Sequence, residues 1–386
     1  MRTRSLGGQM VATVGLGDIS LERASGRGRD PADVERRVHE AIEAALDVLD
    51  VAPELDTERM VGEAVRTLRA RDRVIVATRV EPLGSRDTIL DTMPFGYLLE
   101  RVDASLRATR LDALPLVQLP LRVAWRTQRP WPELVGTCEQ LVRDGKVLRW
   151  GVVSDEPAIL SEPWLASIAV DFSACTRDAA PMLAAAAALP NAPVAPPTDP
   201  FLAIAMENAP IDLLASIAAL QAPTGGGLVL PGVAPAPSAE PAPPPTPRSI
   251  AVLARRPLAG GTLAGALGPG VKLAPKDDRR GIDPEQLEAI ALGIARLAVR
   301  TKREPPAARS SVAARTFMET ARKPPNVICT TVAELALRYV IDRGTIALPR
   351  IHRPDDLYEL VMCGAADPLP AELMARIDEL WPDPTA

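Results

Sequence analysis

The stretch VLDVAPELDTERMVGEAV, residues 48–65, carries the pattern that decides the fold. Its first part is a short apolar run with one acid, Asp50, near the end, and a brief loop leads from this run to an amphipathic segment. Short apolar runs are typical of strands buried on both faces, and apolar residues three and four apart are typical of a covering helix. The stretch therefore predicts a strand, a loop and a helix, with a carboxylate at the end of the strand.

The same alternation recurs through most of the 386 residues of the chain. The other apolar runs are also too short for helices and are rich in Val, Ile and Leu. The predicted strands are 10–19, 48–52, 73–80, 114–121, 147–154, 167–173, 249–258 and 344–351. Helices are predicted between them, for example at 30–49, where Asp30 and Pro31 suit an N-cap and a first helical position. Eight such units predict an α/β fold, a (β/α)₈ TIM barrel, with an open doubly wound sheet as the alternative.

Two long segments interrupt this rhythm. Residues 178–248 hold alanine-rich helical patterns and end in a proline-rich stretch, 231–248, which is typical of an extended surface linker. Residues 301–326 are basic and flanked by Pro-Pro pairs, so they are either a solvated loop or an arm that binds a partner. We predict a single barrel domain over residues 1–386 that carries these two insertions.

The composition excludes several classes of function. Hydrophobic residues make up 47% of the chain and charged residues 24%, which is enough for a large core. The net charge is −5 and the bases form no dominant stripe, so no nucleic-acid partner is expected. No apolar run reaches the ~20 residues that cross a bilayer, and the first residues lack the features of a signal peptide. We therefore predict a cytoplasmic protein without a transmembrane segment.

Motifs for metal or nucleotide binding are weak or lacking in this sequence. The four cysteines lie far apart without a CxxC pair, which predicts reduced thiols and no metal site. Gly15 and Gly17 in VGLGDI form a lone GxG, which is a weak dinucleotide signal. The glycine-rich segment 258–270 contains no GK[ST] and does not predict a triphosphate loop.

The order of the motifs resembles the aldo-keto reductase family of NADPH-dependent barrels. RSLGGQMVATVGLG is similar to the family's N-terminal β-hairpin and first strand, and residues 48–65 are similar to FDTAxxYGxSExxLGxAL. LVRDGKVLRWGVVS is similar to LxxxGKVRxIGVSN, and IAVLARRPLAGGTLAG to xxAYSPLxxGLLTG. The resemblance covers most of residues 1–180 and 249–385, and it implies the barrel fold.

The resemblance also implies four catalytic positions, three of which carry different residue types here. In the family a tyrosine protonates the carbonyl oxygen, a lysine paired with an aspartate lowers the pKa of the tyrosine, and a histidine orients the carbonyl. The aspartate corresponds to Asp50, the tyrosine to Leu55, the lysine to Arg79 and the histidine to Pro120. Leu55 and Pro120 have no side-chain proton donor, and Arg79 keeps only the charge. We expect Asp50 and Arg79 to remain an ion pair at the strand ends.

The remaining tyrosines do not match the position of the acid. They are Tyr97, Tyr339 and Tyr358, and the helical patterns around them predict structural roles.

The cofactor positions that the resemblance implies have also changed. They are Ser154, Asp171, Arg256, Leu258, His352, Arg353 and Glu359. Arginines at the mouth of the predicted barrel, Arg255, Arg256, Arg350 and Arg353, are interpreted either as an anion site or as a solvated rim.

The changed positions lead to a prediction about function. We predict a catalytically inactive barrel that serves as a binding or structural subunit of a larger assembly, with no bound cofactor. Its protein partner would contact the insertions 178–248 and 301–326, because new functions on a barrel usually lie on its loops. Two alternatives remain: an NADPH-dependent carbonyl oxidoreductase with a non-standard active site, and a sensor that binds NADPH without turnover.

Overall fold

The structure, a computed structural model, describes residues 1–21, 30–85, 87–94, 96–189, 250–264, 331–351 and 354–380. Most of the predicted insertions, at 190–249 and 265–330, lie outside the described residues, so their roles stay predictions. The alanine-rich helix predicted at the start of the first insertion is present as α6 (Ala180–Ala187), and it buries Met182 and Leu183.

The described residues form a parallel sheet of eight strands in the order β3 to β10, which follows the chain. A bridge between Val14 and Ala347 closes the sheet into a barrel, and the Ala347 N–H donates to the Thr13 carbonyl over 2.9 Å. All eight predicted strands are present: β3 (Leu16–Ile19), β4 (Val48–Val51), β5 (Ile75–Arg79), β6 (Leu116–Leu119), β7 (Trp150–Val153), β8 (Leu165–Asp171), β9 (Ala251–Arg255) and β10 (Ile346–Leu348). The prediction of a (β/α)₈ barrel is confirmed.

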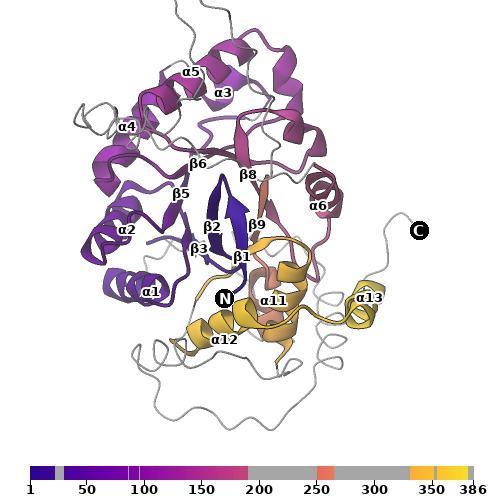
Figure 1. Cartoon of the computed structure of the whole chain (residues 1–386). Coiled ribbons are helices and arrows are strands. Elements are labelled where there is room, and N and C mark those ends of the chain that lie inside the picture. The colour runs from indigo at the N-terminus through magenta and orange to yellow at the C-terminus, as the bar shows by residue number, and fades with distance from the viewer. Residues whose placement is uncertain are drawn as a thin grey trace, which may run out of the picture. The chain divides into compact units, whose positions relative to one another are not determined.

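Helices surround the strands (Figure 1). The α-helices of the described residues are α1 (Pro31–Glu43), α2 (Leu55–Thr67), α3 (Ile89–Thr92), α4 (Tyr97–Thr109), α5 (Trp131–Arg143), α6, α11 (Val332–Asp342), α12 (Pro354–Ala365) and α13 (Ala371–Glu379). Short 3₁₀ helices are η1 (Val123–Thr127), η2 (Pro157–Ser161) and η3 (Ala259–Ala264). The predicted start of α1 is confirmed, because the Asp30 side chain accepts a hydrogen bond from the Ala32 N–H and Pro31 is the first helical residue.

The first predicted strand, residues 10–19, is split into two elements. Its beginning pairs as β2 (Gln9–Ala12) with β1 (Thr3–Leu6) in an antiparallel hairpin, and only its end is barrel strand β3. Leu6 and Val11 of this hairpin are buried among inward residues of the barrel strands. The hairpin, which lies across the ring of strands in Figure 1, therefore closes the amino end of the barrel.

Gly15 and Gly17 are explained by the packing of β3. A Cβ atom at Gly15 would lie 2.3 Å from the Val48 carbonyl oxygen, and one at Gly17 would lie 2.0 Å from the Leu348 carbonyl oxygen. Because both contacts are with backbone of the neighbouring strands, any side chain here would force the barrel open. The lone GxG thus serves the closure of the sheet.

The barrel has two apolar layers. Outward residues of the strands, such as Leu49, Val117 and Ile168, pack against the helices. Inward residues, such as Val48, Leu116 and Ala169, pack with the hairpin. Since side chains alternate along a strand, Asp50, Gln118 and Ser167, each two positions from one of these inward residues, also point into the barrel.

Candidate active site

Asp50 and Arg79 meet at the carboxyl ends of adjacent strands. The Arg79 Nε atom lies 3.7 Å from Asp50 Oδ1, so the predicted ion pair is present. The Asp50 side chain is 1% exposed and that of Arg79 16%. The other carboxylate oxygen, Oδ2, accepts a long hydrogen bond of 3.4 Å from the Asp18 N–H. Within the described part of the chain, Asp50 Oδ1 and Arg79 Nε are buried without a hydrogen-bond partner. The charges of Asp50 and Arg79 compensate each other, but Asp50 Oδ1 can still accept a hydrogen bond and Arg79 Nε can still donate one.

Gln118 and Ser167 extend this polar region and were not among the predicted site residues. Gln118 is paired in register with Arg79 of β5 and with Gly151 of β7, and Gly151 is paired with Ser167 of β8. Both side chains are almost completely buried. A polar residue inside the apolar run LPLVQLPL was a usable signal, because a buried amide needs a partner.

Leu55 and Pro120 occupy the positions at which the resemblance puts a tyrosine and a histidine. Leu55 is the first residue of α2 and is 49% exposed. Pro120 directly follows β6 and is buried. Neither side chain can donate a proton.

The hydroxyl groups of two described tyrosines are engaged in structural hydrogen bonds. The Tyr97 hydroxyl at the start of α4 donates to the Glu81 carbonyl over 2.8 Å, just beyond the carboxyl end of β5. The Tyr339 hydroxyl donates to Asp378 Oδ1 over 2.7 Å. Burial raises the pKa of both phenols, that of Tyr339 to about 12. Tyr358 lies in α12. Tyr97 is on the carboxyl-end side of the barrel, but its hydroxyl already donates a hydrogen bond to the backbone.

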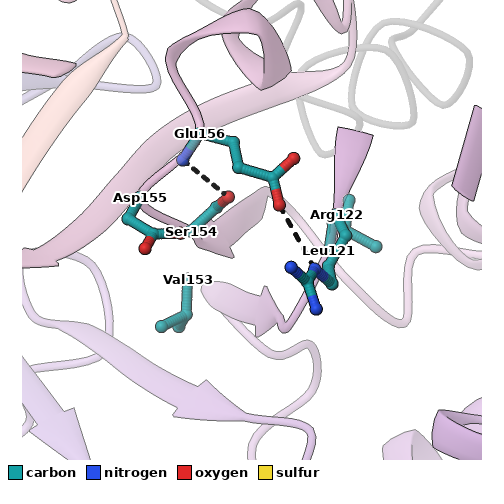
Figure 2. A pocket seen from close by; sticks show the side chains of 6 residues that line it. All are labelled: Leu121, Arg122, Val153, Ser154, Asp155 and Glu156. Carbon is teal, nitrogen blue, oxygen red and sulfur yellow. Dashed lines mark hydrogen bonds and ion pairs between the residues drawn. The ribbon is translucent and has the colours of Figure 1, made fainter. Parts of the chain in front are cut away.

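A pocket of about 230 Å³ lies between the ends of β6 and β7. It is lined by Leu121, Arg122, Val153, Ser154, Asp155 and Glu156. Figure 2 shows Glu156 between two partners: its N–H donates to Ser154 Oγ over 3.2 Å, and Arg122 Nε donates to its carboxylate over 3.2 Å. The Val123 N–H donates to the same carboxylate. Glu156 therefore joins the loops after the two strands and fixes one wall of the mouth.

Arginines and aspartates form further pairs at the same end of the barrel. Asp171 ends β8, and its carboxylate lies 3.9 Å from Arg255 Nε and 3.5 Å from Arg256 Nη1. Arg350, just after β10, forms an ion pair with Asp18. Burial lowers the pKa of the Arg350 guanidinium from its ordinary value. The guanidiniums of Arg255, Arg256 and Arg350 therefore all lie beside carboxylates at this edge of the barrel.

The other predicted cofactor residues divide into two groups. Leu258 is partly buried and packs against the core, and the Glu359 carboxylate accepts a hydrogen bond from the Thr331 hydroxyl. His352 and Arg353 lie outside the described residues. The structure thus brings Asp171 and Arg256 together and leaves Glu359 on α12, bound to the cap of α11.

Among the residues that the structure describes, no group of three or more His, Cys, Asp or Glu side chains is arranged to hold a metal ion. The cysteines in this part of the chain, Cys138, Cys175 and Cys363, are free and buried. Burial raises the pKa of the Cys175 thiol to about 12, which makes it a poor nucleophile. No helix in the same part is long and apolar enough to cross a membrane.

Residues 13–194 match the sequence model of the aldo/keto reductase family. Residues 13–194 belong to this family. The resemblance predicted from the motifs is thereby confirmed, and the matched residues include the barrel strands β3 to β8, at whose carboxyl ends much of the site described above lies.

Two curated relatives match part of the chain. The 6-dehydroglucose reductase of Novosphingobium aromaticivorans is 30% identical over 149 residues, which are 34% of this chain and 44% of that protein. Methylglyoxal reductase YeaE of Escherichia coli is 30% identical over 126 residues, 32% of this chain and 39% of that protein. The match therefore spans less than half the length of either relative.

Solved structures resemble the whole chain at lower identity. The glycerol dehydrogenase of Gluconobacter oxydans superposes with a TM-score of 0.58 at 18% identity, covering 100% of this chain and 98% of that one. An aldo/keto reductase of Klebsiella pneumoniae in complex with NADP and acetate gives a TM-score of 0.51 at 21% identity, covering 98% and 94%. At these identities the likeness shows the fold.

Proposed function

We propose that this barrel is an NADPH-dependent carbonyl oxidoreductase in which the charge of Arg79 stabilises the carbonyl oxygen and no side chain serves as the acid. The observation that carries the proposal is the partly buried guanidinium of Arg79, whose Nε atom lies 3.7 Å from Asp50 Oδ1 at the carboxyl end of the barrel. Its Nε atom has no hydrogen-bond partner among the described residues. A cation with an unused N–H group at this position suits an oxygen that gains negative charge.

The charges at the mouth fit the anionic part of the cofactor. Arg255, Arg256 and Arg350 lie at the ends of adjacent strands, and arginine is well suited to phosphate oxygens. The nicotinamide end fits less closely, because Val153 offers no polar side chain and Asp171 already contacts two arginines. We assign Arg256 to the pyrophosphate and Ser154 to the carboxamide, with His352, Arg353 and Glu359 at the adenosine end.

The chemistry assigned to the chain is electrostatic. When bound, NADPH supplies the hydride for the carbonyl carbon. Arg79 donates a hydrogen bond to the carbonyl oxygen, and Asp50 holds the guanidinium in place. Because arginine keeps its proton near neutral pH, the proton of the alcohol comes from water. The lack of a side-chain acid is expected to reduce the rate by about 10²–10⁴ relative to a complete site.

A binding and turnover experiment tests the proposal. NADPH is titrated while thermal stability is followed, and reduction is then measured with small polar aldehydes and ketones, including methylglyoxal. We expect saturable NADPH binding and slow reduction, with turnover lost in Arg79→Met and binding retained. Arg122→Met is the matched control, since Arg122 also pairs with a carboxylate at the mouth but is more exposed. Reduction that is unchanged in Arg79→Met would reject the role of Arg79.

A second candidate is a binding subunit or NADPH sensor without turnover. It is favoured by Leu55 and Pro120, which remove the acid and the orienting group from the site. Tight NADPH binding without reduction of any carbonyl in the panel would support the sensor. No binding and no reduction would support a structural subunit, whose partner would then be sought through the segments 178–248 and 301–326.

A further inference from the structure

Four polar side chains point into the barrel from β4, β5, β6 and β8, with Gly151 of β7 between the last two. This polar row consists of Asp50, Arg79, Gln118 and Ser167. Arg79 ends β5, Gln118 lies one residue before the end of β6, and Ser167 lies four residues before the end of β8. Since Arg79 pairs with Gln118, and Gln118 and Ser167 both pair with Gly151, the row descends from the mouth towards the middle of the barrel.

Each member of the polar row has a buried polar atom without a partner in the described part of the chain. These atoms are Asp50 Oδ1, Arg79 Nε, Gln118 Nε2 and Oε1, and Ser167 Oγ. Gln118 is 1% exposed and Ser167 is 0% exposed. An unsatisfied buried polar group is costly, and four of them along one line of the sheet indicate a common partner.

The residues around the row are closely packed, which limits the size of that partner. Gly151 lies between Gln118 and Ser167, and a Cβ atom there would be 2.4 Å from Ser167 Oγ and 3.4 Å from Gln118 Cγ. Ser167 also pairs with Ala251, another small residue. The rest of the interior is filled by apolar side chains such as Leu116 and Ala169. In this closely filled interior, a common partner must be a very small molecule that both donates and accepts hydrogen bonds.

We propose that the polar row binds a chain of ordered water molecules that ends at Arg79 and Asp50. Water matches the row because it satisfies donors such as Arg79 Nε and acceptors such as Asp50 Oδ1 alike. The distance of 3.7 Å between these two atoms is too long for a direct hydrogen bond and is compatible with a shared water. Gln118 and Ser167 are then positioning residues for this water.

The water chain deepens the proposed function and, for this step only, rests on it. When the carbonyl oxygen becomes an alkoxide, the O–H bond of the water at Arg79 breaks and its proton forms the O–H bond of the alcohol. The hydroxide stays beside the guanidinium until solvent protonates it. The row thus places a proton donor at the mouth, where Leu55 and Pro120 supply none.

The water chain itself is tested on the free protein, without NADPH. Gln118→Met keeps the volume and removes the amide, and Ser167→Ala removes the hydroxyl. If both groups hold shared water, each change lowers Tm by about 2–4 °C, and the double variant loses clearly less than the two losses combined. Thr13→Val is the control, because Thr13 Oγ1 is also buried without a partner in the described residues but lies outside the row. Its effect should add to that of Gln118→Met.

Two results would overturn the water chain. A rise in Tm for Gln118→Met would show that the amide is simply unsatisfied, and additive losses for Gln118→Met and Ser167→Ala would show no shared partner. Should Gln118→Met not fold, a magnetisation-transfer NMR experiment on the native Gln118 side-chain amide decides. Transfer from long-lived bound water supports the chain, and lack of transfer rejects it.

The outcomes separate the water chain from the proposed function. If the Tm losses of Gln118→Met and Ser167→Ala are non-additive but the protein reduces no carbonyl, the water chain is supported and the reductase function is rejected. If the protein reduces carbonyls but the two Tm losses are additive, the reductase function is supported and the water chain is rejected. If both hold, Ser167→Ala should lower kcat by more than about tenfold while KM for the carbonyl stays the same.

Discussion

Two neighbouring residues of β5 face two buried carboxylates, and the two pairs differ in how well they are satisfied. Thr78 points outward and donates to Glu58 of α2, which also accepts from Arg101 Nη2 over 2.7 Å and from Ser105 Oγ over 3.1 Å. Arg79 points inward to Asp50, which has a 3.7 Å ion pair and one long hydrogen bond. Disrupting a fully bonded buried ion pair destabilises a fold, whereas a partly bonded pair keeps capacity for a ligand. We therefore interpret the outer pair as structural and assign the inner pair to the proposed site.

The largest expected effect is on the outer pair. Glu58→Gln removes a carboxylate that is 0% exposed and leaves Arg101, 10% exposed, without its charge partner. We expect a loss of about 3–5 kcal/mol in the free energy of unfolding, measured by urea denaturation. Glu63→Gln, on the same helix with a side chain that is 53% exposed, is the control and should change the free energy by less than about 0.5 kcal/mol. A small loss for Glu58→Gln would show that this pair does not stabilise the packing of α2 on α4.

A third carboxylate, Asp378, extends the comparison to a tyrosine. Besides the Tyr339 hydroxyl it binds Arg177 Nη1 at 3.1 Å and Arg343, so it is satisfied like Glu58. Burial raises the pKa of Tyr339 to about 12, above the value of about 10 in the unfolded chain. The folded state therefore holds this proton more tightly, and the resulting stability is present below about pH 10 and is lost as the pH rises towards 12.

Alkaline unfolding measures this contribution. Between about pH 9 and 11 the wild-type protein should lose about 1 kcal/mol more than Tyr339→Phe, which has no proton to release. Equal losses in the two proteins would show that Tyr339 is not held by burial and by Asp378.

The inner pair should respond much less than the outer one. Asp50→Asn keeps the shape of the side chain and removes a charge that has one long hydrogen bond. We expect the free energy of unfolding to change by less than about 1 kcal/mol, because Arg79 is 16% exposed and retains contact with solvent. Carbonyl reduction, by contrast, should be lost. A destabilisation as large as that of Glu58→Gln would place Asp50 among the structural pairs and remove the contrast between them.

The sequence predicts the inner pair better than the outer one. The family resemblance implies that Asp50 and Arg79 pair, and the strand pattern agrees with it, because the carboxyl ends of neighbouring parallel strands meet at one edge. The pairing of Glu58 with Arg101 depends on how α2 packs on α4, where Gly62 lets the helix approach the Thr109 backbone closely. The spacing of apolar residues predicts which face of each helix is buried, but it does not predict which helix that face packs against.

The strands and the family resemblance were predictable because short apolar runs and spaced motifs are local signals. The polar row was not, because it depends on register: Gln118 and Ser167 are 49 positions apart in sequence and meet only through Gly151. The hairpin was expected only from the resemblance, since residues 10–19 read as one strand until tertiary pairing divides them. Local pattern therefore gives the elements, and long-range pairing gives the site.

The smallest effect on stability is expected for a substitution at Leu55. The same substitution tests whether the inner pair, Asp50 and Arg79, still forms a catalytic site. Leu55→Tyr changes a side chain that is 49% exposed at the start of α2, so the free energy of unfolding should shift by less than about 0.5 kcal/mol. If Asp50 and Arg79 still form a site, a phenol at this position restores general-acid help, and aldehyde reduction should rise by up to about 10²–10⁴. Leu55→Phe is the matched control, because it adds the same ring without the hydroxyl. A rise in both variants would assign the gain to the apolar ring. No rise in either, with NADPH bound, would mean that the inner pair no longer lies where a carbonyl reacts.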